Sequence, residues 1–438
     1  MRKTLVRLLT LLVLIVPLLA ACGGKPVASP TAAPAATAAA TAAATTAATA
    51  AATAAATAAA TAAATTAPTT EATTAATTAP TAAGTNSSKP RIALVTDTGK
   101  VNDGTFNQFA YEGAKKAADE LGLEFTFIET QASADYVKNI QTFVDEKYDV
   151  IITVGFLIAD ATQAAAAAHP EIKFIGVDQT YSAKAPVATA VPSAATAVPV
   201  TEDEAMTDNL VTLRFREDQA GFLAGALAGM VTKSGTIGIV AGMEIPPVKK
   251  YRNGYENGAK YVNPEVNALG VYVPSFIDSA LGASTAEQMI GDGADVIFGA
   301  GGQTGSGGIT AAAAKGVYVI GVDQDEYAGP TFQGGKASGA GKVLTSAIKR
   351  VDVAVYDQIK AIAAGTFKGK HAVIYEAKDN GVGLAPYHNT DAAIPAAVKA
   401  RIVEIQKALA DGTLTTGVDP ISGDIDQKTV PTAKPFKP

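Results

Sequence analysis

The chain has 438 residues, 48% of them hydrophobic, and a formal net charge of -6. This acidic balance argues against nucleic acid as a partner, because phosphate backbones are bound by basic surfaces. The single cysteine cannot form an internal disulfide, so the fold must depend on its buried core.

The first 22 residues are typical of an export signal that ends in a lipidation site. Arg2, Lys3 and Arg7 supply the positive region, and residues 8–19 supply an apolar stretch that is short for a transmembrane span of about 20 residues. The sequence LAAC then places Cys22 where bacterial lipoproteins carry their lipid. The alternative is an ordinary secretory signal with an incidental cysteine.

Residues 23–90 consist mainly of alanine, threonine and proline, with TAAA repeated in register. Such a segment buries too little side-chain surface to offset the entropy of ordering it, and its threonines and prolines weaken helix formation. We expect a flexible tether, and a chain of ~65 residues has a reach of roughly 45 Å. A mucin-like glycosylated stalk also fits this composition.

From Arg91 onward, apolar runs rich in β-branched residues alternate with stretches of helical spacing such as YEGAKKAADELG. The expected strands are residues 91–96, 123–129, 149–155, 173–178, 236–242, 268–274, 294–301 and 317–323. This alternation predicts βαβ units, and therefore an α/β protein with buried parallel sheets.

The two halves of this region repeat each other. FIGVDQT, which contains Asp178, matches VIGVDQD, which contains Asp323, and YDVIITVG matches ADVIFGAG at nearly the same offset. NQFAYEGAKKA also matches RNGYENGAKYV, which places Phe106 opposite Tyr251. Three matches at nearly one offset predict two copies of one Rossmann-like lobe.

Two facing lobes form a cleft, and ligands of open α/β sheets bind beyond the carboxyl ends of the strands. An aromatic residue from each lobe, Phe106 and Tyr251, would suit a flat ligand, because stacking a base on an aromatic ring is worth ~1–3 kcal/mol. The aspartates at the strand ends would accept hydrogen bonds from hydroxyl and ring N–H groups. These are Asp97, Asp178 and Asp323.

Each of these residues has a structural alternative. Asp97 could cap a turn or the next helix, and Phe106 could face the core at the start of that helix. Tyr251 could be an ordinary core or surface aromatic residue, while the aspartates that end the two repeated strands could be turn residues. Asp103, which precedes a glycine, is better explained as a turn residue than as a ligand contact.

Signatures of catalysis are absent from the sequence. The glycine-rich loop at residues 299–308 is not followed by GK[ST], so it is not a Walker loop, and there is no GxSxG motif. The three histidines are far apart, and the lone cysteine is the expected lipidation site, which leaves no thiol for a Cys–His pair or a zinc site. We expect no enzyme activity, no metal and no cofactor.

Six runs of the sequence resemble the basic membrane protein family of lipoprotein receptors for ABC importers, which includes purine-nucleoside receptors. The resemblance covers the lipidation site and nearly all of residues 91–412. The runs that carry it are DTGKVNDGTFNQ, FREDQAGFLAGALAG, PPVKKYRNGYENG, GADVIFGAGGQTGSGG, YVIGVDQD and LTSAIKRVDVAVYDQI. It implies the type I periplasmic binding protein fold, with two lobes and three crossings between them.

The resemblance also implies lobe boundaries. These are an N-terminal lobe at 91–210 with an inserted flexible segment at about 183–205, a C-terminal lobe at 211–325, a return to the N-terminal lobe at 326–368, and a segment at 369–438 that belongs mostly to the C-terminal lobe and ends in a disordered tail.

In nucleoside receptors of this family, two aromatic rings sandwich the base, while carboxylates and a lysine hold the ribose. Transferred by motif, the resemblance implies that Phe106 and Tyr251 stack the base. Its polar edge would meet Asp97, Asn107 and Asp178. The ribose hydroxyls would meet Asp323, Lys349 and the backbone of Gly301 and Gly302.

The chain departs from the family pattern at several positions. Tyr251 stands where phenylalanine is expected, which adds a hydroxyl that needs a partner. Lys100 and Asn102 replace a glycine and an acidic residue in the first loop. The segment APVATAVPSAATAVPVTEDE follows Asp178 and makes the assignment of that aspartate less secure.

Together these features predict a lipid-anchored receptor on the outer face of the cell membrane that captures a nucleoside, with a purine favoured. Its partners would be an ABC permease and its ATPase. A sugar receptor of the same fold, a tethered sensor without transport, and an enzyme acting on nucleosides are the alternatives.

Overall fold

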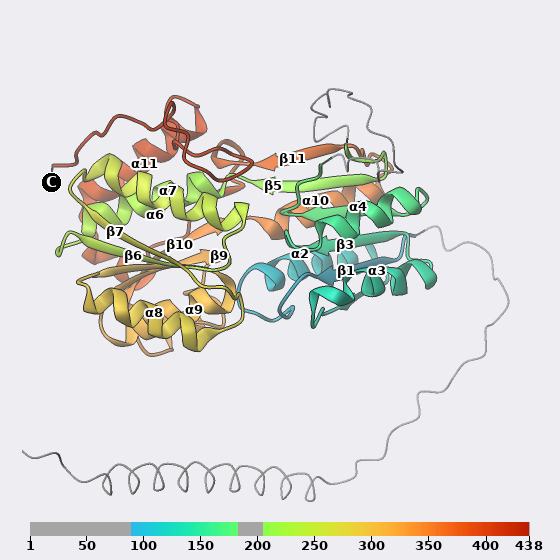
Figure 1. Cartoon of the computed structure of the whole chain (residues 1–438), viewed down its shortest axis with the longest axis horizontal. Coiled ribbons are helices and arrows are strands. Elements are labelled where there is room, and N and C mark those ends of the chain that lie inside the picture. Colours follow the sequence, from blue (N-terminus) through green and yellow to red (C-terminus); the bar gives the residue numbers. More distant parts are fainter. Residues whose placement is uncertain (1–88, 183–204, 438) are drawn as a thin grey trace, which may run out of the picture. The chain divides into compact units, whose positions relative to one another are not determined.

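The structure, a computed structural model, describes residues 89–182 and 205–437. The predicted export signal with Cys22, almost all of the predicted tether and nearly the whole predicted insertion lie outside the described residues. Within them, strands and helices alternate along most of the chain (Figure 1).

All eight strands expected from the sequence are present. The strands are β1 (Ile92–Thr96), β2 (Phe125–Ile128), β3 (Val150–Val154), β4 (Lys173–Val177), β5 (Leu210–Phe215), β6 (Thr236–Ala241), β7 (Asn267–Tyr272), β8 (Val296–Ala300), β9 (Tyr318–Asp323), β10 (Val343–Lys349), β11 (His371–Tyr375) and β12 (Val382–Leu384). Four of these, β5, β10, β11 and β12, are additional to the expected set.

Helices follow most of the strands. The α-helices are α2 (Phe106–Leu121), α3 (Tyr136–Asp145), α4 (Ala159–Ala168), α6 (Glu217–Val231), α7 (Pro246–Val262), α8 (Ser279–Gly291), α9 (Gly302–Ala314), α10 (Val351–Ala363) and α11 (Ala396–Ala410). Short 3₁₀ turns are η1 (Ser133–Asp135), η2 (Gln333–Gly335), η3 (Ala340–Lys342), η4 (Ala377–Asp379) and η5 (His388–Ala393).

The strands form two six-stranded sheets with matching orders, β11-β5-β4-β3-β1-β2 and β12-β10-β9-β8-β6-β7. Every pair in the first sheet is parallel, and in the second sheet β12 alone runs antiparallel to its neighbour β10. The repeat found in the sequence maps strand for strand from one order onto the other. The structure therefore confirms two copies of one lobe.

Strand periodicity decides which helices cover each face. In β1, Ile92 and Leu94 pack in the cluster that includes α2 and α10, whereas Ala93 and Val95 pack with α3 and α4. The second sheet repeats this arrangement, with α6 and α7 on one face and α8 and α9 on the other (Figure 1). Both sheets are therefore buried on both faces, as their nearly continuous apolar strands require.

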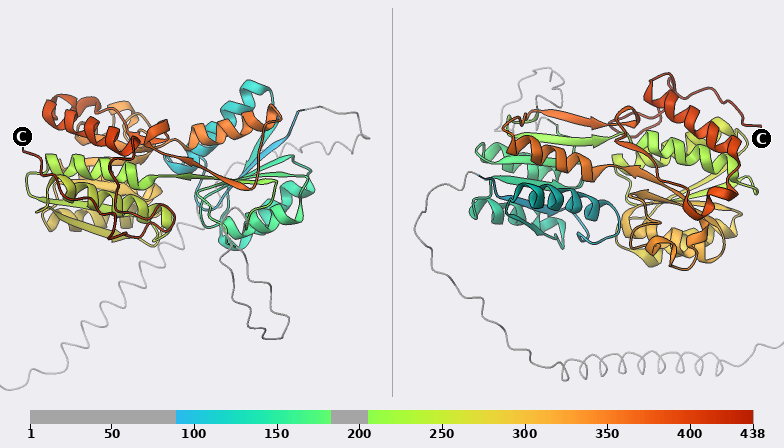
Figure 2. Two further views of the ribbon diagram at one scale, coloured as in Figure 1. Left: turned by 90° about the horizontal axis from the view of Figure 1, so that it is seen from above. Right: turned by 180° about the vertical axis from the view of Figure 1, so that it is seen from behind.

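The chain crosses between the lobes three times. β5 ends in the first sheet, and α6 packs on α7 in the second lobe; β10 ends in the second sheet, and α10 packs on α2 in the first. β11 then pairs with β5 before the chain returns to β12 (Figure 2). The chain passes from one lobe to the other at residues 216, 350 and about 376, rather than at residues 210, 325 and 368 as expected.

The physical reason for the first two differences lies in the strand that precedes each crossing. β5 is LVTLRF and β10 is VLTSAIK, so polar residues interrupt both apolar runs and hide them from a periodicity argument. Both strands belong to the lobe that precedes the crossing, which moves each boundary toward the C-terminus.

The first two crossings have the same local structure. Arg216 (φ -88°, ψ 64°) precedes α6, and Arg350 (φ -80°, ψ 59°) precedes α10. Each guanidinium donates two hydrogen bonds to the aspartate two residues later, at 2.8 and 2.7 Å for Asp218 and at 2.8 and 2.9 Å for Asp352. The repeat thus extends to the hinge segments, where a bidentate arginine–carboxylate pair fixes each connection.

Glycines allow α6 and α7 to approach closely. A methyl group at Gly225 would lie 1.9 Å from the carbonyl oxygen of Tyr255, and one at Gly258 would lie 2.0 Å from that of Phe222. The backbones therefore touch at these positions, and the approach places the N-terminal part of α7 beside the first crossing.

We expect Gly225→Ala to destabilise the protein by about 1–3 kcal/mol, because the methyl group would overpack against backbone that cannot move aside. Gly291→Ala in α8 is the matched control, since a methyl group there has no atom within 4 Å. The free energy of unfolding in urea measures both. Equal stability of the two variants would contradict the packing argument.

Candidate functional site

A cleft between the two sheets encloses about 660 Å³ of empty space, part of it open to solvent. That size is within the range of small-molecule sites. Its walls bring together all of the ligand-binding residues expected from the sequence: Asp97, Phe106, Asn107, Asp178, Tyr251, Gly301, Gly302, Asp323 and Lys349. They come from both lobes.

Asp178 and Asp323 occupy equivalent positions at the ends of β4 and β9. Both adopt the left-handed backbone conformation, with φ of 63° and 64°. Residues other than glycine are uncommon there, and such strain concentrates at functional sites. The shared conformation turns both carboxylates toward the cleft, where both residues are buried yet line the cavity.

Asp97 follows β1 and is 6% exposed. Its Oδ2 accepts a hydrogen bond from the backbone N–H of Leu157 at 3.2 Å. Burial raises the pKa of this carboxyl to about 7, although backbone amides oppose the shift. Gly155 has a φ of 118°, and a Cβ there would lie 2.0 Å from Asp97 Oδ2, so glycine is required beside this carboxylate.

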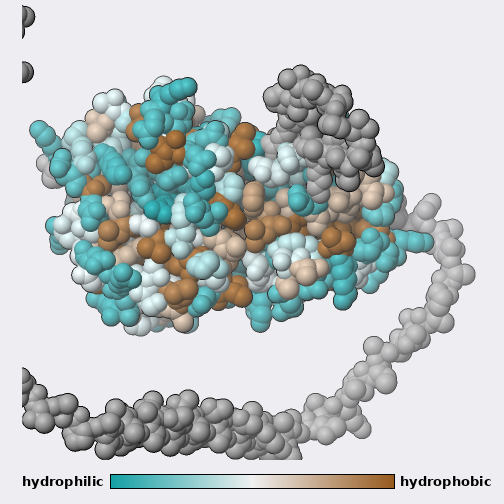
Figure 3. Space-filling model, in the orientation of Figure 1, coloured by the Kyte–Doolittle hydropathy of each residue, from teal (hydrophilic) through white to brown (hydrophobic). Residues whose placement is uncertain are grey.

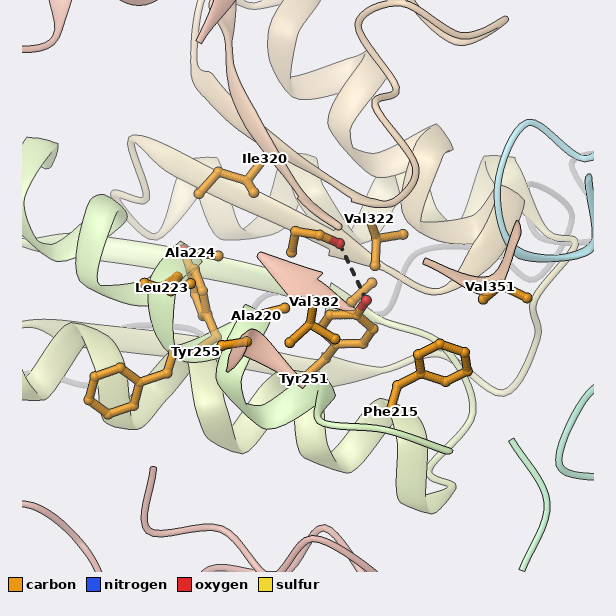
Figure 4. Close-up of a cluster of buried hydrophobic side chains, with 14 of the residues drawn as sticks. Phe215, Ala220, Leu223, Ala224, Tyr251, Tyr255, Ile320, Val322, Val351 and Val382 are labelled. Atoms are coloured by element: carbon orange, nitrogen blue, oxygen red, sulfur yellow. Dashed lines mark hydrogen bonds between the residues drawn. The ribbon is translucent and has the colours of Figure 1, made fainter. Parts of the chain in front are cut away.

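Tyr251 carries a hydroxyl that the phenylalanine of the family pattern lacks, and this hydroxyl has hydrogen-bond partners. It donates to Asp323 Oδ1 at 3.2 Å or to the carbonyl oxygen of Ala347 at 3.3 Å. The ring is only 4% exposed, meets Phe298 edge-on and lies among buried apolar side chains (Figure 4). Burial raises the pKa of Asp323 to about 7 despite the nearby Lys349 ammonium. Tyr251 therefore orients Asp323 from the wall of the cleft.

Lys349 brings charges from both lobes together. Its amino group forms ion pairs with Asp178 of the first lobe and, at 2.9 Å, with Glu217 of the second. The same Nζ lies 4.7 Å from the centre of the Phe106 ring and covers one of its faces. Burial lowers the pKa of this amine, but the surrounding carboxylates outweigh it and hold the amine protonated.

The loop before α2 is fixed by Asp103, whose carboxylate accepts the backbone N–H groups of Thr105, Asn107 and Gln108. Asp103 thus holds the turn, as expected, and it also lines the cleft. The Asn107 amide donates to the carbonyl oxygen of Thr98 at 2.8 Å and to Asp103 at 3.1 Å. Its Oδ1 has no hydrogen-bond partner among the described residues, so an acceptor is left for a ligand.

On the opposite side of the cleft, α9 begins at Gly302, with Gly301 as its N-cap. A Cβ at Gly301 would lie 2.5 Å from the backbone nitrogen of Gly242, and Gly302 has a φ of 56°. Glycine is therefore needed at both positions for the backbone to line the cleft. The adjacent helix N-terminus presents N–H groups to acceptors.

Three further residues belong to this region and were not expected from the sequence. Phe156 and Phe276 line the cleft and are partly exposed. Each lies in a loop just beyond a strand that was expected, so the strand-end argument applied to every strand, rather than to the repeated motifs alone, could have found them. Glu217 lies behind the cleft and carries no such signal, because it opens a helix within the polar stretch REDQ, where nothing in the sequence distinguishes it from its neighbours.

The lobes also touch at the loop edges. The Gln324 side-chain amide donates to the carbonyl oxygen of Gly104, so residues that follow β9 contact the loop before α2. Together with the Lys349–Asp178 pair, this contact joins the lobes.

The surface drawn in Figure 3 shows hydrophobic residues interspersed with hydrophilic ones.

The chemistry of the cleft is that of an acceptor-rich site with aromatic walls. The cleft is lined by four aspartates and a single lysine: Asp97, Asp103, Asp178, Asp323 and Lys349. Asp178 Oδ1 has no hydrogen-bond partner among the described residues. Such a site suits a neutral ligand with several O–H and N–H donors and a flat apolar face. In the parts of the chain that the structure describes, no group of three or more His, Cys, Asp or Glu side chains is placed to hold a metal ion.

Comparisons with known proteins agree with this description. Residues 90–413 match the family model described as "ABC transporter substrate-binding protein PnrA-like". The "ABC transporter nucleoside-binding protein BmpA" of Lactococcus lactis is 30% identical over 338 residues, covering 74% of this chain and 88% of the relative. An "uncharacterized lipoprotein" of Pyrococcus abyssi is 33% identical over 314 residues, covering 68% and 70%.

Among solved structures, an ABC transporter solute-binding protein from Aeropyrum pernix superposes with a TM-score of 0.60 at 28% sequence identity. The match covers 74% of this chain and 92% of that protein. The two-lobed α/β arrangement of sheets is therefore shared with a solute-binding protein.

The raised pKa values predict a pH dependence of stability. The aspartates Asp97 and Asp323 ionise near pH 4 when unfolded, whereas their pKa values in the folded protein are about 7. Their stabilising contribution is thus complete below about pH 4 and is lost as the pH rises toward about 7. Asp97→Asn, which is neutral at every pH, should reduce this loss in the ligand-free protein.

Urea unfolding at about pH 5 and about pH 8 measures the effect as a difference in the free energy of unfolding. Asp145→Asn, at an exposed position in α3, is the control and should leave the difference unchanged. A wild-type difference retained in full by Asp97→Asn would show that this carboxyl is not the titrating group.

Proposed function

Because this chain belongs to the basic membrane protein family of ABC transporter substrate-binding proteins, we propose that the ligand in its cleft is a nucleoside, with a purine nucleoside favoured. The chain is a substrate-binding protein rather than an enzyme. The observation that carries the proposal is a cleft in which carboxylates from both lobes surround a partly exposed aromatic ring, that of Phe106.

The base is assigned to the aromatic side chains. Lys349 covers one face of the Phe106 ring, which leaves the opposite face for stacking. From the second lobe, Phe276 is partly exposed and rests against Gly242, where a Cβ would lie 2.3 Å from the phenylalanine ring. Since Tyr251 is nearly buried, we assign the second stacking surface to Phe276 and the support of Asp323 to Tyr251.

The polar groups divide between base and ribose. Asp97 and the unpartnered oxygens of Asn107 and Asp178 would accept hydrogen bonds from N–H groups of the base. Asp323, Lys349 and the Gly301–Gly302 backbone would hold the ribose hydroxyls. A phosphorylated ligand is disfavoured, because its charge would meet several carboxylates and a single cleft lysine.

Delivery and anchoring complete the proposal. The receptor would be held on the outer face of the membrane by lipid on Cys22 and would pass its nucleoside to an ABC permease driven by an ATPase. Among the residues that the structure describes, none of the helices is long and apolar enough to cross a membrane. The lipid of the proposed anchor would supply the membrane attachment.

We predict that Phe106→Ala weakens binding of a purine nucleoside such as inosine by roughly tenfold or more, because one stacking surface for the base is lost. Isothermal titration calorimetry measures the affinity. Phe127→Ala, which removes a 39% exposed ring on β2 away from the cleft, is the control and should bind like the wild type. Affinity unaffected by the loss of Phe106 would remove its stacking role.

We also predict that Cys22→Ser moves the full-length protein from the membrane fraction to the soluble extracytoplasmic fraction, because the lipid has no attachment point. Fractionation followed by immunoblotting shows the distribution. Ligand affinity of the purified domain should not change, since Cys22 is not among the residues that line the cleft. A variant that stays with the membrane would contradict lipid anchoring at this residue.

A further inference from the structure

A buried charge network lies next to the cleft, and its centre is Glu217, the first residue of α6. Glu217 is fully buried and is not part of the cleft wall. Its carboxylate pairs with Lys250 at 2.5 Å and with Lys349 at 2.9 Å. Although burial opposes ionisation, the two ammonium groups lower the pKa of Glu217, so the carboxylate is charged at neutral pH.

The two lysines differ in what else holds them. Lys250 also donates to the backbone carbonyl oxygen of Phe215 at 2.8 Å. Lys349 has one other ion-pair partner among the described residues, Asp178 in the opposite lobe. Asp178 lines the cleft, so Glu217 is the carboxylate that holds Lys349 from within its own lobe, independently of any group that a ligand would engage.

Glu217 also links the two main crossings. It follows Arg216 at the first crossing, while Lys349 precedes Arg350 at the second. The ion pair between them therefore fixes the Lys349 amino group relative to both hinge segments. It holds this group over the Phe106 ring and within reach of Asp178, at the point where the two lobes meet.

We propose that Glu217 is a positioning residue for ligand binding, which holds the ammonium of Lys349 in place so that it can meet the hydroxyl groups of a nucleoside without rearrangement. The inference rests on the proposed function and deepens it. The negative charge of Glu217 offsets the burial of the lysine, and its location outside the cleft leaves the lysine's cleft side available to the ligand.

The test is a double-mutant cycle read by calorimetry with inosine. Glu217→Gln keeps the shape of the side chain but removes its charge, and it should weaken binding by about tenfold or more in the wild-type background. In the Lys349→Met background the same substitution should change the affinity less than about twofold, because its target is gone. An equal loss of inosine affinity in both backgrounds would overturn the inference, because Glu217 would then have only a structural role.

Glu326→Gln is the matched control. Glu326 is also fully buried in the second lobe, but it accepts hydrogen bonds from Ser306, Thr331 and the backbone of Val322 and does not contact Lys349. This variant should lose stability and keep its affinity for inosine. If Glu217→Gln does not fold, Glu217→Asp takes its place, and its shorter carboxylate should give a smaller loss of affinity that again disappears in the Lys349→Met background.

A second measurement needs no ligand. In protein labelled with ¹⁵N-lysine, the ammonium protons of Lys349, assigned by their absence in Lys349→Met, should exchange with water about tenfold faster or more in Glu217→Gln than in the wild type. Unchanged exchange would overturn the positioning role whatever the ligand is. A different outcome would count against the nucleoside assignment alone. In that case the wild-type protein does not bind inosine, but the ammonium protons of Lys349 still exchange faster in Glu217→Gln.

Discussion

A buried ammonium group joins the parts of this molecule. The amino group of Lys349 meets Asp178 from one lobe and Glu217 from the other, and it rests on the face of Phe106. A buried charge is costly unless it is paired, so these partners must stay close together. The constraint holds the end of β10, the start of α6 and the turn after β4 close together. Lys349 and Asp178, which lie there, line the cleft.

Much of this arrangement could be predicted because the chain repeats itself. Matching motifs placed Asp178 and Asp323 at equivalent strand ends, and the structure gives both the same left-handed backbone. Parallel sheets bring the carboxyl ends of their strands to one edge, so residues far apart in sequence could be assigned to one cleft without coordinates. The expected eight strands followed from the same regularity, since apolar residues predominate in each of these runs.

What the sequence did not reveal has physical reasons. β5 and β10 carry Thr, Arg, Ser and Lys where apolar residues would mark a strand, and these strands decide where the lobes change. Phe276 follows an expected strand, but its position in the cleft depends on its contact with Gly242, which is distant in sequence. Tyr251 was placed correctly on the cleft, but the depth to which its ring is buried depends on its contacts with Phe298 and Asp323, which are distant in sequence. Pairings of this kind have no local signal.

The central claim is that an acceptor-rich cleft with aromatic walls holds a nucleoside as one unit, base and ribose together. Calorimetric titration of the wild-type protein with inosine, cytidine, D-ribose and D-glucose tests it most directly. The account predicts saturable binding of at least one nucleoside, with inosine the tightest, and much weaker binding of both free sugars. Tight binding of a free sugar, with no heat from either nucleoside, would contradict it.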